Sequence, residues 1–187
     1  YMKVLKDNTS NIHIALHEPV VPQNTGNIAR TCAVTGCALH LVGKLGFEIS
    51  DAKLKRAGLD YWHSLEIYRN ETLDELFSML EGWNFFYFTT KAARCYCDVE
   101  YPQRSCLIFG KETSGLPTQL LDSHPERCVR IPMKSEQRSL NLSNSVAIAT
   151  YEVLRRRGFE GLEQQGLMKS FDYQSDIRGL NTEVSST

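Results

Sequence analysis

The sequence of 187 residues lacks the features of a membrane, secreted or repetitive protein. No apolar run approaches the ~18 residues that a membrane-spanning helix needs, and no charged-then-apolar leader precedes the first motif. No repeat or low-complexity linker interrupts the chain, and its apolar (42%) and charged (23%) fractions are those of ordinary globular domains. We therefore expect a soluble, cytoplasmic protein that has no membrane partner and folds as a single domain.

Cysteine is also scarce and scattered. The six cysteines are too few and too widely spaced for a disulfide scaffold. Cys95 and Cys97 form a Cys-x-Cys pair, but no second pair stands at the spacing that zinc sites use. We expect no metal site, and reduced cysteines that mostly fill the core.

An excess of positive charge is missing as well. Lys and Arg number 21 and Asp and Glu number 22, which gives a net charge of −1. This balance excludes a protein that coats nucleic acid through its overall charge. Any contact with a polyanion must come from local patches, such as the cluster of Lys53, Lys55 and Arg56.

Short runs rich in β-branched and aromatic residues alternate with helical stretches along the chain. Expected strands cover residues 12–16, 39–42, 65–68, 83–89, 105–109 and 128–131, and expected helices cover 24–35, 51–58, 72–80, 117–122 and 142–157. This alternation is typical of an α/β fold in which helices flank a largely parallel sheet. We expect one domain over residues 12–158, an N-terminal extension (1–11) in which Tyr1 is a cloning remnant, and a polar C-terminal tail (159–187).

The two longest helices carry recognisable signals at their ends. In the first, Asn24 can cap the amino end and Gly36 can close the carboxyl end. In the last, Asn141 or Ser143 can cap the start, and residues 146–154 are apolar nearly all round the helix. A helix of this kind is buried on more than one side, so a second copy of the chain is its simplest partner.

Neither of the common glycine-rich phosphate motifs, G-x-G-x-x-G and G-x-x-x-x-G-K-[ST], is present. Polar residues gather instead in three clusters near the ends of expected strands, where open parallel sheets bind ligands. In the first cluster, Asn24, Asn27 and Arg30 recur every three residues and can share a helix face that receives a phosphate. The alternative is an ordinary capped helix with a surface arginine.

The second cluster, residues 107–117, is a strand that runs into a loop between Gly110 and Gly115, with Glu112 beside them. Two glycines allow a ligand to approach the backbone closely, although a simple strand-to-helix turn would use them too. The third cluster, residues 131–145, places many Asn and Ser side chains at the start of the last helix. These side chains can orient a substrate, or they can serve only as helix caps and as hydrogen bonds between loops.

Together the three clusters resemble the motifs of the SPOUT (SpoU–TrmD) RNA methyltransferases. Asn24-x-Gly26-x-x-x-Arg30 resembles motif 1, Phe109-Gly110-x-Glu112-x-x-Gly115-Leu116-Pro117 motif 2, and Ile131-Pro132-Met133 with Arg138-Ser139-Leu140-Asn141-Leu142-Ser143-Asn144 motif 3. The likeness covers residues 12–158 and is to the minimal, SpoU-type branch, which methylates the ribose 2′-oxygen of the tRNA wobble nucleotide (position 34, cytidine or modified uridine). Lys111 and Ser114 depart from that branch, which often has Pro and Arg at these positions.

The resemblance implies S-adenosylmethionine as methyl donor, a C-terminal trefoil knot, a homodimer, and the tRNA anticodon stem-loop as substrate. It implies cofactor contacts from Phe88, Thr89, Thr90, Gly110, Glu112, Gly115, Ile131, Met133, Ser139 and Leu140. It places catalysis on Arg30, with Glu112, Ser139 and Asn141 as organisers of the site. It implies RNA contacts from Asn24, Arg30, Lys55, Arg56, Lys111 and Arg138.

The role of Arg30 and the identity of the RNA stay open at this point. A guanidinium remains protonated in ordinary settings, so Arg30 suits a role that holds a phosphate and polarises the 2′-hydroxyl better than a role as base. Two alternative functions are 2′-O-methylation of ribosomal RNA and non-catalytic RNA binding on the same fold. Enzymes that act on ribosomal RNA commonly carry an added RNA-binding domain, and a non-catalytic protein is expected to have lost motif residues, so both are less favoured.

Overall fold

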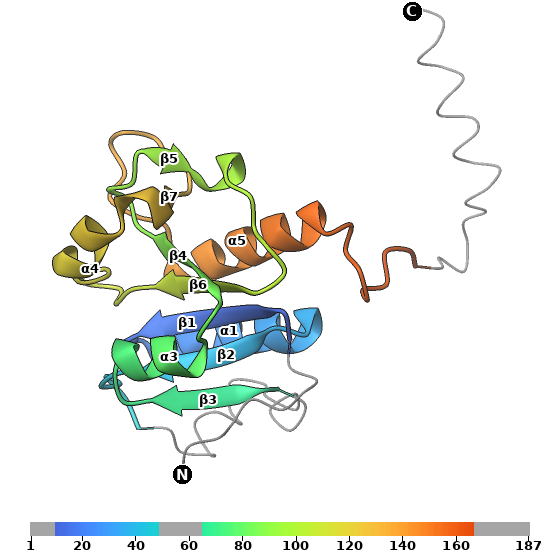
Figure 1. Ribbon diagram of the computed structural model, residues 1–187, viewed down its shortest axis with the longest axis horizontal. Helices are drawn as coiled ribbons and strands as arrows, with labels where there is room; N and C mark the ends of the chain where they lie inside the picture. The colour runs from blue at the N-terminus through green and yellow to red at the C-terminus, as the bar shows by residue number, and fades with distance from the viewer. Residues whose placement is uncertain (1–9, 49–64, 167–187) are drawn as a thin grey trace, which may run out of the picture.

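A computed structural model describes residues 10–48 and 65–166, which form a parallel sheet with helices on both faces (Figure 1). The strands are β1 (Ile12–His17), β2 (Ala38–Val42), β3 (Ile67–Asn70), β4 (Asn84–Phe88), β5 (Arg94–Cys95), β6 (Ser105–Phe109) and β7 (Cys128–Arg130). The helices are α1 (Pro22–Thr35), α3 (Leu73–Met79), α4 (Thr118–Ser123) and α5 (Leu142–Arg156), with 3₁₀ turns at Tyr96–Asp98 and Pro125–Arg127. The predicted class, a parallel α/β sheet flanked by helices, is confirmed.

The strand order in the sheet is β3-β2-β1-β6-β4-β7-β5, and every pairing is parallel. Strands β1, β2 and β3 follow one another toward one edge of the sheet. Strand β6 lies between β1 and β4, and β7 lies between β4 and β5. The carboxyl ends of β6, β4 and β7 are therefore neighbours at one edge of the sheet. Ligands of open parallel sheets bind at such an edge.

Two apolar clusters, one on each face of the sheet, hold the fold together. The first joins the sheet to α1 and α5, and includes Ile28 and Val146. The second joins it to α3 and α4, and includes Leu76 and Leu121. Strands β2 and β6 are buried along their whole length, as expected for parallel strands that are covered by helices on both faces. No helix in the described part of the chain has the length and apolarity to cross a membrane.

The predicted elements that fall within the described residues are all present, with ends that shift by at most two residues. The helix predicted at 51–58, together with the expected RNA contacts Lys55 and Arg56, lies outside the described residues. Strand β5 was not predicted, because two residues are too few to show a periodic pattern.

The amino ends of α1 and α5 are closed differently. Helix α1 begins at Pro22, and its N-cap residue Val21 offers no side-chain acceptor, so the prediction that Asn24 caps this helix is wrong. Helix α5 is capped by Asn141, whose Oδ1 accepts hydrogen bonds from the backbone N–H groups of Ser143 and Asn144. The unpaired backbone N–H groups at the start of α1 must therefore find hydrogen-bond acceptors in another part of the chain.

Helices α1 and α5 lie against each other on the same face of the sheet, and each leaves apolar side chains uncovered. Val34 of α1 is 52% exposed, and Ile148 and Tyr151 of α5 are 38% and 47% exposed. Ala149, next to Ile148, is fully buried in the core of the same chain. The apolar circumference predicted for α5 thus serves two purposes, one face packing on the sheet and another facing outward.

A buried chain of polar groups crosses β1, β2 and β3 on the α3 face. His13 Nδ1 lies 2.8 Å from His40 Nε2, and His40 Nδ1 lies 2.9 Å from Asn70 Oδ1. The amide oxygen of Asn70 can only accept, so His40 donates to it from Nδ1 and accepts from His13 at Nε2. Both imidazoles are then neutral. Burial lowers the pKa of His13 to about 3 and that of His40 to about 4.

Candidate active site

A cavity of about 640 Å³ opens where β4, β6 and β7 end. This volume lies within the ~300–1,000 Å³ range of small-molecule sites. Its walls come from the loops that follow these three strands and from the start of α1. The residues predicted to contact a cofactor all line it: Phe88, Thr89, Thr90, Gly110, Glu112, Gly115, Ile131, Met133, Ser139 and Leu140.

Part of the cavity lining is apolar. The rings of Phe88 and Phe109 stack with their centroids 4.6 Å apart, and both side chains are nearly buried at the ends of neighbouring strands. Leu140 also lines the cavity and is 37% exposed, which is unusual for a large aliphatic side chain. Apolar surface of this kind, beside a few polar groups, is typical of sites that bind aromatic or heterocyclic ligands.

The loop after β6 folds back on itself so tightly that position 110 accepts only glycine. A Cβ atom on Gly110 would lie 2.1 Å from the carbonyl carbon of Gly115 and 2.2 Å from the nitrogen of Leu116. The N–H of Gly115 donates to the carbonyl oxygen of Lys111 over 2.8 Å and closes the loop, with Gly115 at a positive φ of 72°. The backbone of this loop is thereby held at the wall of the cavity.

The carboxylate of Glu112 accepts hydrogen bonds from backbone N–H groups at the start of α1. It accepts hydrogen bonds from the backbone N–H groups of Val20 (2.9 Å) and Val21 (3.2 Å) and from the Asn24 side chain (3.0 Å). A negative charge here also suits the positive end of the helix dipole. Burial by itself would raise the pKa of Glu112, but the bonds from Val20, Asn24 and Val21 outweigh it and lower the pKa. Glu112 is therefore an ionised group whose lone pairs are already in use.

Asn24 links this carboxylate to the start of α5. Its Nδ2 donates to Glu112, and its Oδ1 accepts a hydrogen bond from Asn141 Nδ2 over 3.0 Å. Asn141 in turn caps α5 through its own Oδ1. We call Glu112, Asn24 and Asn141 the amide frame. It joins one residue from each of the three clusters found in the sequence.

The predicted cationic residues are divided between two places. Lys111 and Arg138 line the cavity, and Lys111 Nζ also lies 3.3 Å from the Glu18 carboxylate. Arg30 is exposed on α1 and does not line the cavity. An α-helix turns by about 100° per residue, so six residues carry Arg30 well away from the direction of Asn24. The predicted shared face of the first cluster is therefore wrong for Asn24, which alone of the three is buried.

Sequence reasoning gave no site role to several residues that line the cavity, among them Val21 and Leu121. Val21 also donates its N–H to Glu112. Lys91, expected as one of the cations near the motif loops, lines the cavity directly after the predicted contact Thr90. Val21 contributes mainly through its backbone, for which its residue type gives no signal.

Comparisons with known proteins find consistent relatives. The model of the SpoU rRNA Methylase family matches residues 11–151. A protein from Listeria monocytogenes serotype 4b (strain F2365) is 49% identical over 156 residues, 82% of this chain and 92% of its own, and is named for 2′-O-methylation of cytidine 34 of tRNA. The tRNA (cytidine(34)-2′-O)-methyltransferase of Methylovorus glucosotrophus (strain SIP3-4) is 44% identical over 149 residues, 79% of this chain and 97% of its own.

A solved structure has the same arrangement. It is described as giving insight into the 2-OH methylation of C/U34 on tRNA, and it superimposes with a TM-score of 0.75 at 37% sequence identity. The match covers 80% of this chain and 97% of that one. The likeness therefore extends over nearly the whole length of that protein.

Proposed function

The chain belongs to the SpoU rRNA methylase family, and from this premise we propose that it is an S-adenosylmethionine-dependent methyltransferase acting on the ribose 2′-oxygen of nucleotide 34 of tRNA. The observation that carries the proposal is the cavity at the ends of β4, β6 and β7, where residues of motifs 2 and 3 meet Asn24 of motif 1. Relatives named for this reaction match over almost their whole length, which favours tRNA over ribosomal RNA.

The cavity fits S-adenosylmethionine in size and in chemistry. The backbone around Gly110 and Ile131 offers donors and acceptors for the edge of an adenine ring, and Phe88 and Leu140 offer apolar surface for its faces. Gly110 lets the loop fold back against Gly115 and Leu116, which keeps its backbone at the cavity wall. When bound, S-adenosylmethionine supplies a methyl group that its sulfonium already activates.

The chain itself contributes mainly positioning and charge. Arg30 holds the phosphate next to the target nucleotide and polarises its 2′-hydroxyl, and as a guanidinium it stays protonated while doing so. Glu112 does not act as a base, since its carboxylate is occupied by three hydrogen bonds and its pKa is lowered. It acts through the amide frame, which fixes the loops that carry Ser139 and Asn141. Lys111 and Arg138 add positive charge for the RNA at the cavity wall.

We also propose that the active form is a homodimer. Val34 of α1 and Ile148 and Tyr151 of α5 are exposed apolar side chains on two helices that pack together, and a two-fold pairing of these helices with those of a second copy would cover them. Arg30 lies on α1 and outside the cavity of its own chain. In a dimer formed through α1 and α5, it would act at the cavity of the partner.

The strand order supports the trefoil knot that the resemblance implies. Strand β6 inserts between β1 and β4, and β7 then inserts between β4 and β5, two strands that follow each other directly in the chain. Knots are rare because connections seldom thread through loops. We propose that the segment from β4 to α5 is threaded in this way, around the same loops that line the cavity.

The direct test measures 2′-O-methylated nucleosides by mass spectrometry. Bulk tRNA from cells with and without the gene is digested, and loss of 2′-O-methylcytidine or 2′-O-methyluridine from position 34 in the deletion strain is expected. The purified chain with S-adenosylmethionine should restore the mark on an anticodon stem-loop. A mark that disappears from ribosomal RNA while tRNA stays unchanged would overturn the tRNA assignment.

A further inference from the structure

Two of the six cysteines differ sharply from the rest. Cys32, Cys37, Cys106 and Cys128 are buried, as the sequence predicts for core-filling thiols. Cys95 is half-buried and Cys97 is exposed. Burial raises the pKa of Cys32, Cys37 and Cys106, which makes those thiols unreactive. A thiol-specific reagent in water therefore meets Cys95 and Cys97 first.

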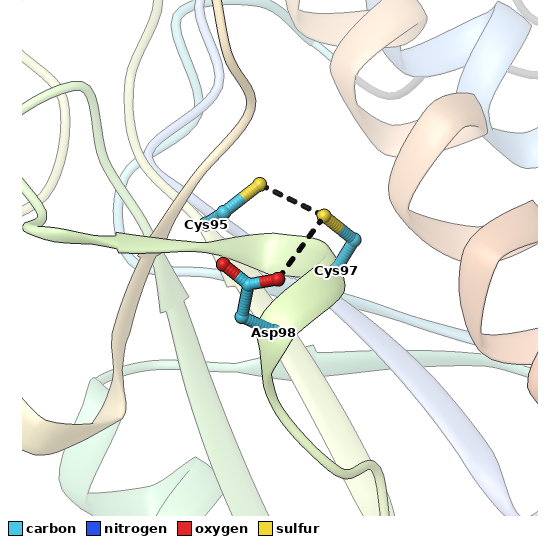
Figure 2. A group of neighbouring side chains, drawn as sticks. All are labelled: Cys95, Cys97 and Asp98. Atoms are coloured by element: carbon cyan, nitrogen blue, oxygen red, sulfur yellow. Dashed lines mark hydrogen bonds between the residues drawn. The ribbon is translucent and has the colours of Figure 1, made fainter.

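These two sulfurs lie side by side at the end of β5 (Figure 2). Cys95 Sγ and Cys97 Sγ are 3.0 Å apart, and Cys97 Sγ lies 3.7 Å from Asp98 Oδ1. The hydrogen bond with Cys95 is the main reason that the pKa of Cys97 is raised to about 11. Either thiol can be the donor in this contact, and the two sulfurs are close enough for one to attack a disulfide formed on the other.

The location of the pair connects it to the cavity. Strand β5 pairs with β7, with Cys95 opposite Arg130, and the next residue after Arg130 is the cavity residue Ile131. On the other side, Lys91 lines the cavity three residues before Arg94, the first residue of β5. A change in the backbone at Cys95 therefore reaches two walls of the cavity through short, continuous segments.

We propose that Cys95 and Cys97 form a redox site, at which a small disulfide such as oxidised glutathione converts the two thiols into an intrachain disulfide, and that closing this bond weakens ligand binding in the cavity. The Cys95 thiolate attacks oxidised glutathione and forms a mixed disulfide, releasing one glutathione thiolate. Cys97 then loses its proton and attacks the Cys95 sulfur, which releases the second glutathione. Two thiols and one oxidised glutathione give one protein disulfide and two molecules of glutathione.

A metal ion is a weaker occupant of the same place. Cys95, Cys97 and Asp98 offer three donor atoms within 4.8 Å of one another, and no fourth His, Cys, Asp or Glu joins them among the residues that the structure describes. Two sulfurs of a tetrahedral zinc site lie about 3.8 Å apart, farther than these two. The guanidinium of Arg156 donates to the Cys97 carbonyl oxygen, which brings a positive charge to the backbone of the same turn.

The test uses the full chain, reduced and then exposed to oxidised glutathione at pH 8. Trypsin releases residues 95–104 as one peptide that contains only these two cysteines. After free thiols are blocked with N-ethylmaleimide, this peptide should have lost two hydrogens and carry no label, and dithiothreitol should reverse the change. Cys97→Ser should instead accumulate glutathione on Cys95. A wild-type peptide that stays doubly labelled overturns the proposal.

Calorimetry with S-adenosylhomocysteine tests the link to the cavity, and this part rests on the proposed function. The oxidised wild type should bind S-adenosylhomocysteine at least about fivefold more weakly than the reduced form. Cys97→Ser treated with oxidised glutathione should lose less affinity. Equal affinities with the disulfide formed would overturn the link. Failure of both forms to bind would contradict the proposed function but not the disulfide. One zinc ion per chain that protects both thiols would overturn the redox site in favour of a metal site.

Discussion

The side-chain amide of Asn141 donates a hydrogen bond to the side-chain oxygen Oδ1 of Asn24 over 3.0 Å, although 117 positions separate the two residues. The direction of this bond is fixed. The Glu112 carboxylate can only accept, so Asn24 must turn its NH₂ toward Glu112 and its oxygen toward Asn141. The amide frame is therefore an ordered relay in which each amide has one possible orientation.

Replacing Asn24 with aspartate should break this relay at one point. Asn24→Asp sets a second carboxylate about 3 Å from Glu112, where like charges disfavour ionisation. We expect the free energy of unfolding to fall by about 2 kcal/mol at pH 7.5, and the loss to shrink at pH 5 as one carboxyl takes up a proton. Denaturant titrations at the two pH values measure this. Asn27→Asp, on the exposed side of the same helix, is the control and should change stability by less than about 0.5 kcal/mol.

Gly110→Ala tests the tight loop after β6. Its Cβ would collide with the backbone of Gly115 and Leu116, so the loop must move out of its position at the cavity wall. Affinity for S-adenosylhomocysteine should fall at least about tenfold in calorimetry, because the backbone contacts of the loop are lost. Gly166→Ala, which meets no atom within 4 Å, should bind normally. Unchanged binding by Gly110→Ala would show that this loop does not hold the ligand.

Arg30→Ala separates chemistry from cofactor binding. The single-turnover rate of tRNA methylation should fall by at least ~100-fold, since the charge that positions the phosphate and the 2′-hydroxyl is removed. Affinity for S-adenosylhomocysteine should barely change, because the proposed cofactor contacts lie on the loops after β4, β6 and β7, whereas Arg30 lies on α1. Arg30→Lys should recover little activity, as an ammonium cannot make the planar two-pronged contact. Arg104→Ala, an exposed control before β6, should keep the wild-type rate; a normal rate in Arg30→Ala would remove Arg30 from the catalytic residues.

The buried pair of His13 and His40 predicts a loss of stability in mild acid. Both have a lowered pKa in the folded state, whereas in the unfolded chain they titrate near 6.5. Below pH 6.5 the unfolded state therefore binds more protons than the folded state, and stability falls as the pH drops from 6.5 toward 4. Each histidine contributes up to about 1.4 kcal/mol per pH unit, and above pH 7 neither contributes.

Urea titrations between pH 7.5 and 5 measure this slope. Replacing both residues by phenylalanine should flatten it, while the control His124→Gln, at a partly exposed histidine away from this pair, should change it much less. A wild-type stability that does not change between pH 6.5 and 5 would contradict the neutral, buried state of the pair.

A charge on the outer face of α5 tests the proposed dimer. Tyr151→Glu places a carboxylate on this face in place of an exposed apolar side chain, and light scattering should then report the mass of one 21.3 kDa chain instead of two. Gln119→Glu on α4, on the opposite face of the sheet, is the matched control and should stay dimeric. A wild-type protein that is already monomeric at micromolar concentration would refute the dimer.

The regular elements could be predicted from the sequence because each leaves a local pattern. The strand around Ser105–Phe109 is a continuous apolar run, and α1 ends at a glycine that takes the left-handed conformation. The outward face of α5 could not be predicted, because Ile148 and Ala149 are both apolar and only tertiary contacts decide which is covered. The amide frame was not predictable either. Asn24 looks like a helix cap in sequence, and only the fold brings Glu112 close enough to take over that task.

The amide frame can form only late in the synthesis of the chain, because it needs Asn141. At typical elongation rates, Asn24 leaves the ribosome's catalytic centre roughly ten seconds before Asn141 is made. Until then the nascent chain has α1 and even Glu112 but lacks the last partner of the relay. A translation product that stalls before α5 therefore has an incomplete ligand site.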